Sequence, residues 1–271
     1  MLTTEQIEQY LLNVYSGQTN LFNLPLNVYL DSSSKLLQGV IQGYGGGLAD
    51  FAIGSPNYEL AKKLHLNIYN FSAAKTFQEV RSIQSKIMDD KGYIRSFNDF
   101  KKDASEIFDT YNKNWLKTEY NTAINQSYSA NRWLEIQENK DIFKYLRYQT
   151  AGDERVRDEH AILDDIVKPV DDPFWNTYYP PNGWSCRCLV VEEEVITEKE
   201  IKQAEKAEQD LKDLKKENKK EYDKQYPPLF RENVGKTGKV FKETHPYYDV
   251  PSKYADLKAK NFDLPIPNNL K

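Results

Sequence analysis

Residues 148–160 of this chain read YQTAGDERVRDEH, and they begin a segment of unusual composition that extends to residue 188. It continues with DDPFW (171–175) and ends with PPNGWSCRC (180–188). Glycine, proline and asparagine favour tight turns here, while tryptophan and phenylalanine supply apolar volume for a small core. We therefore predict a compact α+β module of short elements over residues 140–195.

Two short strands are expected to border this module. Residues 143–150 alternate aromatic or apolar with polar side chains, which is typical of a strand. Residues 185–191 are expected to form the closing strand. Between them, Asp153 is placed to cap a short helix over residues 154–160.

The two arginines of this segment have structural roles available. Arg155 and Arg157 are two positions apart and would not share a helix face. At least one of them is expected to form a two-pronged ion pair with a carboxylate such as Asp164.

The residues before this module, 1–139, predict a mainly helical part. Apolar side chains recur every three or four positions, as on one face of a helix. Thr3 or Thr4 is expected to cap the first helix, and Ser32–Ser34 is expected to cap the second. A break near Asn70–Ser72 is expected to divide a later helical pattern into two helices.

A glycine-rich run, GYGGG at residues 43–47, resembles a phosphate-binding loop at first sight. It lacks the Gly-Lys-Ser/Thr ending of such loops, and no clear strand precedes it. A flexible or tightly packed turn explains it better.

The residues after the module are highly charged. From Glu198 to Lys224 the chain has nine acidic and nine basic side chains, interleaved along a predicted helix. Its thin apolar stripe suits a projecting helix, a strut or half of a coiled coil. We expect four parts in all: a helical part at 1–139, the module at 140–195, the charged helix at 196–226 and an irregular tail at 227–271.

The composition excludes several classes of protein. The formal net charge is −4, which does not indicate binding to nucleic acid, because that needs clustered cations. No apolar run is long enough to span a membrane, and the first residues do not resemble a signal peptide. Two cysteines are too few for a disulfide framework. The cytoplasm is therefore the expected compartment.

A metal site is one hypothesis for the polar residues of the module. In a strand, Cys186 and Cys188 would project to the same face. With His160 they would supply three zinc ligands, and Asp153, Asp164 or water would be the fourth. The alternative is a pair of packed free thiols, with His160 hydrogen-bonded to a neighbouring carboxylate.

The motif resembles the conserved module of the phage Mu F-like family of head-morphogenesis proteins. Members typically show Thr-x-Gly-Asp-x-Arg-Val-Arg-x-x-His, then Pro-Phe-Trp, then Pro-Pro-x-Gly-Trp-x-Cys-Arg-Cys, in this order. Here Asp164-Asp165 stands where many members have Asp-Gly. The residues that match the motif are Thr150, Gly152, Asp153, Arg155, Arg157, His160, Asp164, Phe174, Trp175, Pro181, Gly183, Trp184, Cys186, Arg187 and Cys188.

The resemblance implies a mainly helical α+β protein of the phage head, without enzymatic activity. It implies association with the portal or the inner capsid surface, and a role in head assembly and in DNA packaging or ejection. A phage or prophage gene, a bacterial host cytoplasm during assembly and a place in the virion head follow from it. Portal or capsid subunits are the expected partners, and neither a membrane nor direct DNA contact is indicated.

Two other functions remain open. The first is a metal-dependent hydrolase, nuclease or toxin-like effector that uses His160, Cys186 and Cys188. The second is a delivery or adaptor module, because Mu F-like modules also resemble the front ends of larger toxin chains.

Overall fold

The computed structural model describes residues 2–270 and groups the chain into two compact units made of discontinuous segments. The first unit comprises Met1–Gly39, His65–Asn121 and Glu243–Lys271, and the second comprises Val40–Leu64 and Thr122–Lys242. The predicted division at residues 139, 195 and 226 follows the order of elements along the chain, and as a division into independent domains it stays a prediction.

Three long helices contribute residues to both units: α2 (Leu26–Tyr44), α3 (Pro56–Gln84) and α5 (Leu116–Asn139). Helix α3 has 29 residues, and a helix of that length extends about 44 Å, which exceeds the width of one small core. Boundaries drawn along the sequence therefore differ from the two units, because each unit combines segments from different parts of the chain.

The first unit also contains α1 (Thr4–Tyr15) and α4 (Phe97–Asp109), which continues through a π-helical turn at Thr110–Trp115 into α5. The predicted cap at Thr3 is confirmed: its hydroxyl accepts from the amide of Gln6, and the Gln6 side chain accepts from the amide of Thr3. The core of these helices is formed by Tyr10, Leu11, Val14, Val28, Val80, Ile83, Phe100, Ala104 and Phe108.

Two expectations about these helices are wrong. Helix α2 begins at Leu26, so Ser32 and Ser33 are buried inside it and do not cap it. Helix α3 runs through the expected break at residues 70–72 without interruption. Phe71 and Ser72 are fully buried there, and burial of a helix face outweighs the weak helix propensity of asparagine and serine.

The end of the chain packs into the first unit as a series of short turns. These are η4 (Pro246–Tyr248), η5 (Ser252–Tyr254), α11 (Ala255–Ala259), η6 (Asn261–Asp263) and η7 (Asn268–Leu270). The ring of Tyr247 stacks on Tyr111, and its hydroxyl donates to Glu119 at 2.8 Å. The predicted irregular tail is thus short turns fixed by buried aromatic side chains.

The second unit contains a three-stranded antiparallel sheet in the order β2-β1-β3. Its strands are β1 (Tyr145–Gln149), β2 (Val167–Pro169) and β3 (Leu189–Glu193). The first predicted strand is present with shorter bounds, the second begins later and ends later than the expected residues 185–191, and β2 is an addition. In the register, Arg147 lies opposite Val167 on one side and Val191 on the other.

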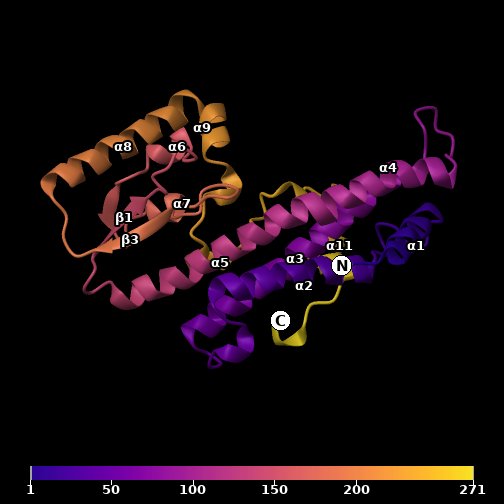
Figure 1. The fold of residues 1–271 in the computed structure, drawn as a ribbon, viewed down its shortest axis with the longest axis horizontal. Helices are drawn as coiled ribbons and strands as arrows, with labels where there is room; N and C mark the ends of the chain where they lie inside the picture. The colour runs from indigo at the N-terminus through magenta and orange to yellow at the C-terminus, as the bar shows by residue number, and fades with distance from the viewer. Residues whose placement is uncertain (1, 271) are drawn as a thin grey trace. The chain divides into compact units, whose positions relative to one another are not determined.

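The second unit also contains the helices α6 (Asp158–Ala161), α7 (Trp175–Tyr178), α8 (Glu198–Glu217), α9 (Lys219–Gln225) and α10 (Val234–Thr237), with 3-10 turns at η1 (Leu48–Asp50) and η3 (Pro228–Phe230). Figure 1 shows α8 beside the sheet, and both contribute to one core. That core contains Trp133, Ile136, Leu146, Tyr148, Leu163, Ile166, Val170, Phe174, Trp175, Tyr178, Tyr179, Val190, Ala204, Leu211, Tyr222 and Tyr226.

The charged helix differs from the expectation in two ways. It is interrupted at Asn218, whose side chain accepts from the amide of Glu221 and so caps α9. Its thin apolar stripe is buried within its own unit at Ala204, Leu211 and Tyr222. It is therefore part of the module core rather than a projecting strut.

The predicted fold class, a mainly helical α+β protein, is confirmed. None of the helices formed by residues 2–270 has the length and apolar character needed to cross a membrane.

Candidate metal centre

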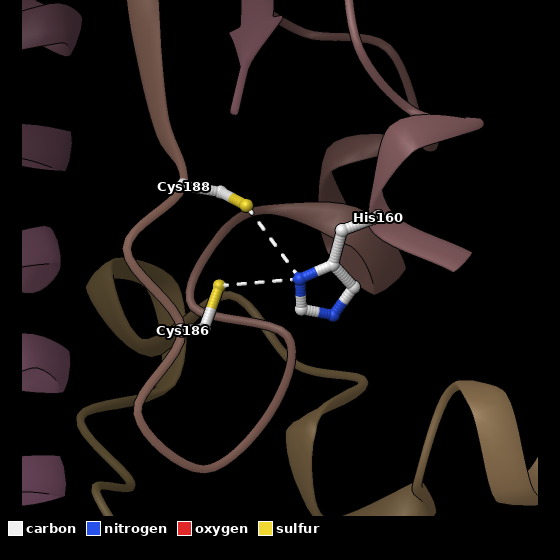
Figure 2. A group of neighbouring side chains, drawn as sticks. All are labelled: His160, Cys186 and Cys188. Atoms are coloured by element: carbon white, nitrogen blue, oxygen red, sulfur yellow. Dashed lines mark hydrogen bonds between the residues drawn. The ribbon is translucent and has the colours of Figure 1, made fainter. Parts of the chain in front are cut away.

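Three side chains from two segments of the second unit converge on a single point. His160 comes from helix α6, while Cys186 and Cys188 precede strand β3. The Sγ atoms of Cys186 and Cys188 lie 3.7 and 3.6 Å from the same atom, Nδ1 of His160 (Figure 2). Within residues 2–270, these three form the group of His, Cys, Asp and Glu side chains whose ligand atoms lie within 4.8 Å of one another.

The cysteine-bearing segment is irregular and is not the strand that was expected. Strand β3 begins only at Leu189, and Ser185 adopts the left-handed backbone conformation with φ 55°. The amide of Cys186 donates to the carbonyl of Gly183. A tight turn, rather than the two-residue repeat of a strand, therefore brings both thiols to one side.

Side chains from the sheet and from the turn fix the position of this segment. Asn182 is buried and accepts a hydrogen bond from the hydroxyl of Tyr148 at 3.0 Å. Tyr148 lies on β1 and is fully buried. Sequence reasoning did not select Tyr148 as a site residue, although its place directly before the motif and its alternation with Leu146 indicate an inward-facing position.

His160 is held in the interior by its helix. It is 3% exposed, its amide donates to the carbonyl of Arg157, and its Nε2 has no hydrogen-bond partner among the residues that the structure describes. The hydroxyl of Tyr226 donates to the carbonyl of the preceding Glu159 at 2.6 Å, which ties α6 to the end of α9.

The two thiols influence each other's ionisation. A hydrogen bond from Cys188 holds the pKa of Cys186 well below its usual range, and the neighbouring His160 acts in the same direction. The same interaction raises the pKa of Cys188, and burial raises it further.

Asp153 does not join this group. Its carboxylate accepts two parallel hydrogen bonds from Arg187, from Nη1 at 2.8 Å and from Nη2 at 2.6 Å. Arg155 adds a longer ion pair at 3.3 Å. These interactions, above all the one with Arg187, hold the pKa of Asp153 well below its usual range.

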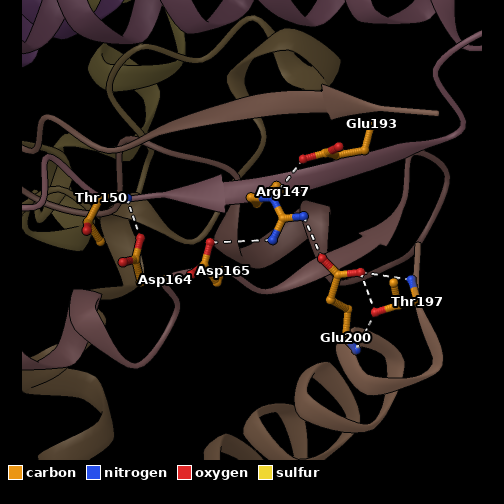
Figure 3. Close-up of polar contacts among 7 residues, drawn as sticks. All are labelled: Arg147, Thr150, Asp164, Asp165, Glu193, Thr197 and Glu200. Atoms are coloured by element: carbon orange, nitrogen blue, oxygen red, sulfur yellow. Dashed lines mark hydrogen bonds and ion pairs between the residues drawn. The ribbon is translucent and has the colours of Figure 1, made fainter. Parts of the chain in front are cut away.

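The expected ion pair between Asp164 and an arginine of the motif is wrong. Asp164 accepts from the backbone amide of Thr150 at 2.7 Å (Figure 3). The guanidinium of Arg157 donates instead to the carbonyl of Trp184 at 2.5 Å. The expected helix over residues 154–160 is also shorter, because Asp153 accepts from the amide of Arg155 in a turn and α6 begins only at Asp158.

The glycines of the motif have separate physical reasons. Gly152 adopts φ 65°, a conformation that other residues rarely take. A Cβ atom on Gly183 would lie 2.8 Å from Nη1 of Arg157, so the small residue admits the guanidinium. Asp165, in the position where many Mu F-like proteins have glycine, has φ 60°, which aspartate tolerates better than most residues.

The apolar residues of the motif build the core around the site. Phe174 and Trp175 are buried, and Nε1 of Trp175 donates to the carbonyl of Pro169. The ring of Trp184 contacts Phe230 edge to face. Pro181 follows Pro180 through a cis peptide bond and leads into the turn at Asn182.

Arg147 is a polar anchor that sequence reasoning missed. Its guanidinium donates to Glu193 and to Glu200, each at 2.7 Å, and forms a longer ion pair with Asp165 (Figure 3). Glu200 belongs to the capping box of α8 with Thr197. The arginine thus joins the outer strand β3 and the start of the charged helix through β1.

A hollow of about 320 Å³ opens beside the thiols. It is lined by Ala151, Arg155, Val156, Arg157, His160, Ser185, Cys186, Arg187 and Cys188. A catalytic Cys–His pair would need a further group that orients the imidazole through its second nitrogen. Nε2 of His160 has no such partner among residues 2–270.

Part of this chain, which includes the candidate metal centre, is similar to known proteins. Residues 60–191, just under half of the chain, match the family model described as Phage Mu protein F like protein. This match confirms the resemblance inferred from the motif. No solved structure matches this chain.

Two curated relatives are similar over a shorter stretch. The chain is 44% identical over 75 residues to the putative capsid assembly protein F of Escherichia phage Mu, which is 28% of this chain and 17% of that protein. It is 41% identical over 75 residues to the Mu-like prophage FluMu F protein of Haemophilus influenzae, covering 28% of this chain and 18% of the relative. The matched stretch spans less than a fifth of the length of either relative.

Proposed function

We propose that this chain, whose residues 60–191 carry the Mu F-like region, is a structural protein of phage head assembly. The phage Mu relative is named as a putative capsid assembly protein, and the related protein from Haemophilus influenzae is named as part of a Mu-like prophage. These names support a role in head morphogenesis for a protein encoded by a phage or prophage.

One observation carries the proposal: most of the shared motif builds a scaffold. Asp153 and Arg187 join its two ends, Trp175 fills the core, and Gly183 admits the guanidinium of Arg157. A rigid assembly module needs side chains that make structural contacts, whereas an enzyme needs polar side chains that remain accessible to a substrate.

The finer role that we propose is association with the portal or with the inner capsid surface. The outer face of α8 offers acidic and basic side chains to a protein partner and is not a cationic face for DNA. The protein would lie in the virion head after assembly in the bacterial cytoplasm, and would act in assembly and in DNA packaging or ejection without catalysing a reaction.

Genetic complementation tests this proposal in the phage or prophage that encodes the chain. Deletion of the gene is expected to lower the titre of infectious particles by several orders of magnitude and to leave aberrant or empty heads in electron micrographs. The wild-type gene restores the titre, and so does Lys102→Ala, which changes an exposed side chain of α4, away from the face of α8 proposed to bind a partner. Trp175→Ala, which removes the centre of the module core, is expected not to restore it.

Cross-linking in purified heads tests the finer role. Mass spectrometry is expected to find this chain in a few copies per particle, linked to portal or capsid subunits. A normal titre after deletion, or absence of the protein from particles at every stage of assembly, would contradict a role in the head. Turnover of nucleic acid or ester substrates that His160→Ala abolishes would favour the enzymatic alternative.

A further inference from the structure

The geometry around His160 matches the edges of a tetrahedral zinc site. With Zn–S bonds of about 2.3 Å and a Zn–N bond of about 2.0 Å, the N···S edge of a tetrahedron is about 3.5 Å and the S···S edge about 3.8 Å. The two N···S distances are 3.7 and 3.6 Å, and all three ligand atoms lie within 4.8 Å of one another. The two N···S distances are therefore close to the edges of a tetrahedral zinc site, and the two sulfur atoms are near enough to share one ion.

Hydrogen bonding alone does not account for this arrangement. Nδ1 of an imidazole has either one proton or one lone pair in the ring plane, so it makes one well-directed hydrogen bond. Here two sulfur atoms lie at nearly equal distances from that one nitrogen (Figure 2). A cation between the three atoms gives each of them a full interaction.

We propose that His160, Cys186 and Cys188 bind one structural zinc ion. The proposal is independent of the role in head assembly, because it rests only on these three side chains. Thiolate and imidazole ligands suit zinc, whereas calcium and magnesium require oxygen ligands. Zinc also has no redox chemistry, which suits an ion with a structural role.

The fourth corner is assigned to a water molecule in the hollow beside the site. Asp153, the acidic candidate of the motif, is occupied by two hydrogen bonds from Arg187. Asp164 accepts from the amide of Thr150. The hollow of about 320 Å³ is lined by all three ligand residues and provides space for solvent at this corner.

The ion would connect segments that lack regular secondary structure between them. His160 is 26 residues before Cys186, and the chain between them contains only the short elements β2 and α7. A bond from helix α6 to the turn before β3 would restrict this stretch in the folded state and close a long loop. Loss of the ion is thus expected to destabilise the second unit.

Elemental analysis of the full chain tests the proposal directly. The protein is produced in zinc-supplemented medium with a tag that contains no histidine, and metal content is measured by inductively coupled plasma mass spectrometry. About one zinc per chain is expected. Cys186→Ser, Cys188→Ser and His160→Ala are each expected to lower zinc content at least tenfold after dialysis against a competing chelator.

Two matched variants serve as controls. His65→Ala removes another buried histidine, and Asp153→Asn removes the acidic candidate ligand; both are expected to keep about one zinc per chain. A tenfold loss of zinc in Asp153→Asn would overturn the assignment of water to the fourth corner. Circular dichroism of every variant separates loss of zinc from loss of fold.

Cobalt substitution of the wild-type protein gives a readout that does not depend on any variant. Co²⁺ added to the reduced, metal-free chain is expected to give intense visible d–d bands of tetrahedral cobalt and a thiolate-to-cobalt charge-transfer band. The chain has two cysteines, so this band reports on Cys186 and Cys188 alone. No zinc after growth with zinc, together with no charge-transfer band in a folded and reduced chain, would overturn the proposal.

Discussion

The guanidinium of Arg187 donates two parallel hydrogen bonds to the carboxylate of Asp153, at 2.8 and 2.6 Å, and so joins the beginning and the end of the shared motif. The two residues are 34 positions apart. Arg187 stands in the sequence between the two cysteines that face His160.

Arg187→Ala is expected to lower the free energy of unfolding only slightly, because the pair is partly exposed to solvent. Arg187→Lys is expected not to restore it, since an ammonium group cannot form the two-pronged pair. Urea denaturation followed by tryptophan fluorescence measures both. Full stability of the lysine variant would show that charge alone, without the fork, is sufficient.

The ion pair between Asp153 and Arg187 also predicts that the stability of the fold decreases at acid pH. Arg187 holds the pKa of Asp153 below the usual value of about 3.9 for an unfolded chain. The contribution of the ion pair to stability is therefore complete above about pH 4, and it is lost as the pH falls further toward the pKa of Asp153 in the folded state. Wild type and Asp153→Asn are expected to converge in melting temperature below pH 4, and a constant difference between them would contradict this.

Glu79, in the first unit, predicts a pH dependence of stability with the opposite sign. Burial raises its pKa to about 7, although Lys75 beside it favours the charged form. Tyr10, Tyr111 and Glu119 are the other titratable groups near it. The folded state keeps this proton between about pH 4.3 and pH 7 while the unfolded state loses it, so stability falls as the pH rises through that window.

Glu79→Gln removes this titration. The variant is expected to gain stability relative to wild type between pH 4.5 and pH 7, by an amount on the order of 3 kcal/mol at pH 8. Glu106→Gln, on the exposed face of α4, is the matched control and is expected to change nothing. Thermal unfolding at several pH values measures the effect, and parallel pH profiles of wild type and Glu79→Gln would contradict it.

Gly43 predicts a packing defect within the second unit. A Cβ atom at this position would lie 2.1 Å from the backbone oxygen of Ile124, which cannot move without shifting helix α5. Gly43→Ala is expected to lower the free energy of unfolding by about 2–3 kcal/mol. Gly47→Ala, where the nearest atoms are 3.7 Å away, is expected to be nearly neutral in the same urea titration.

The backbone conformation of Asp165 predicts which substitutions the turn after Leu163 tolerates. Its φ of 60° suits glycine and is accessible to aspartate. Asp165→Gly is expected to remain within about 1 kcal/mol of wild type, because it loses only an exposed ion pair with Arg147. Asp165→Val is expected to lose about 1–2 kcal/mol, since a β-branched residue is strained there. Equal stability of the two variants would contradict a left-handed turn.

Local sequence signals determined the parts of this fold that local energy decides. The cap at Thr3, the helix that follows it and the strand before the motif were all predicted correctly. Each depends on contacts between residues a few positions apart, or on a repeat that the side chains themselves display. The order of uncommon residues in the motif was likewise sufficient to predict the resemblance to the Mu F-like family, which the match over residues 60–191 confirms.

Only the tertiary structure decided which distant groups share an interaction. The sequence offered Asp164 as a partner for an arginine, but Asp164 binds the amide of Thr150, and Arg187 pairs with Asp153. It predicted that a strand would align the thiols, whereas an irregular turn directs both to His160. Which distant residues interact depends on the packing of the whole core, and no local sequence pattern specifies that geometry. Packing also explains why α3 continues without interruption through residues 70–72, where the local sequence favours a break.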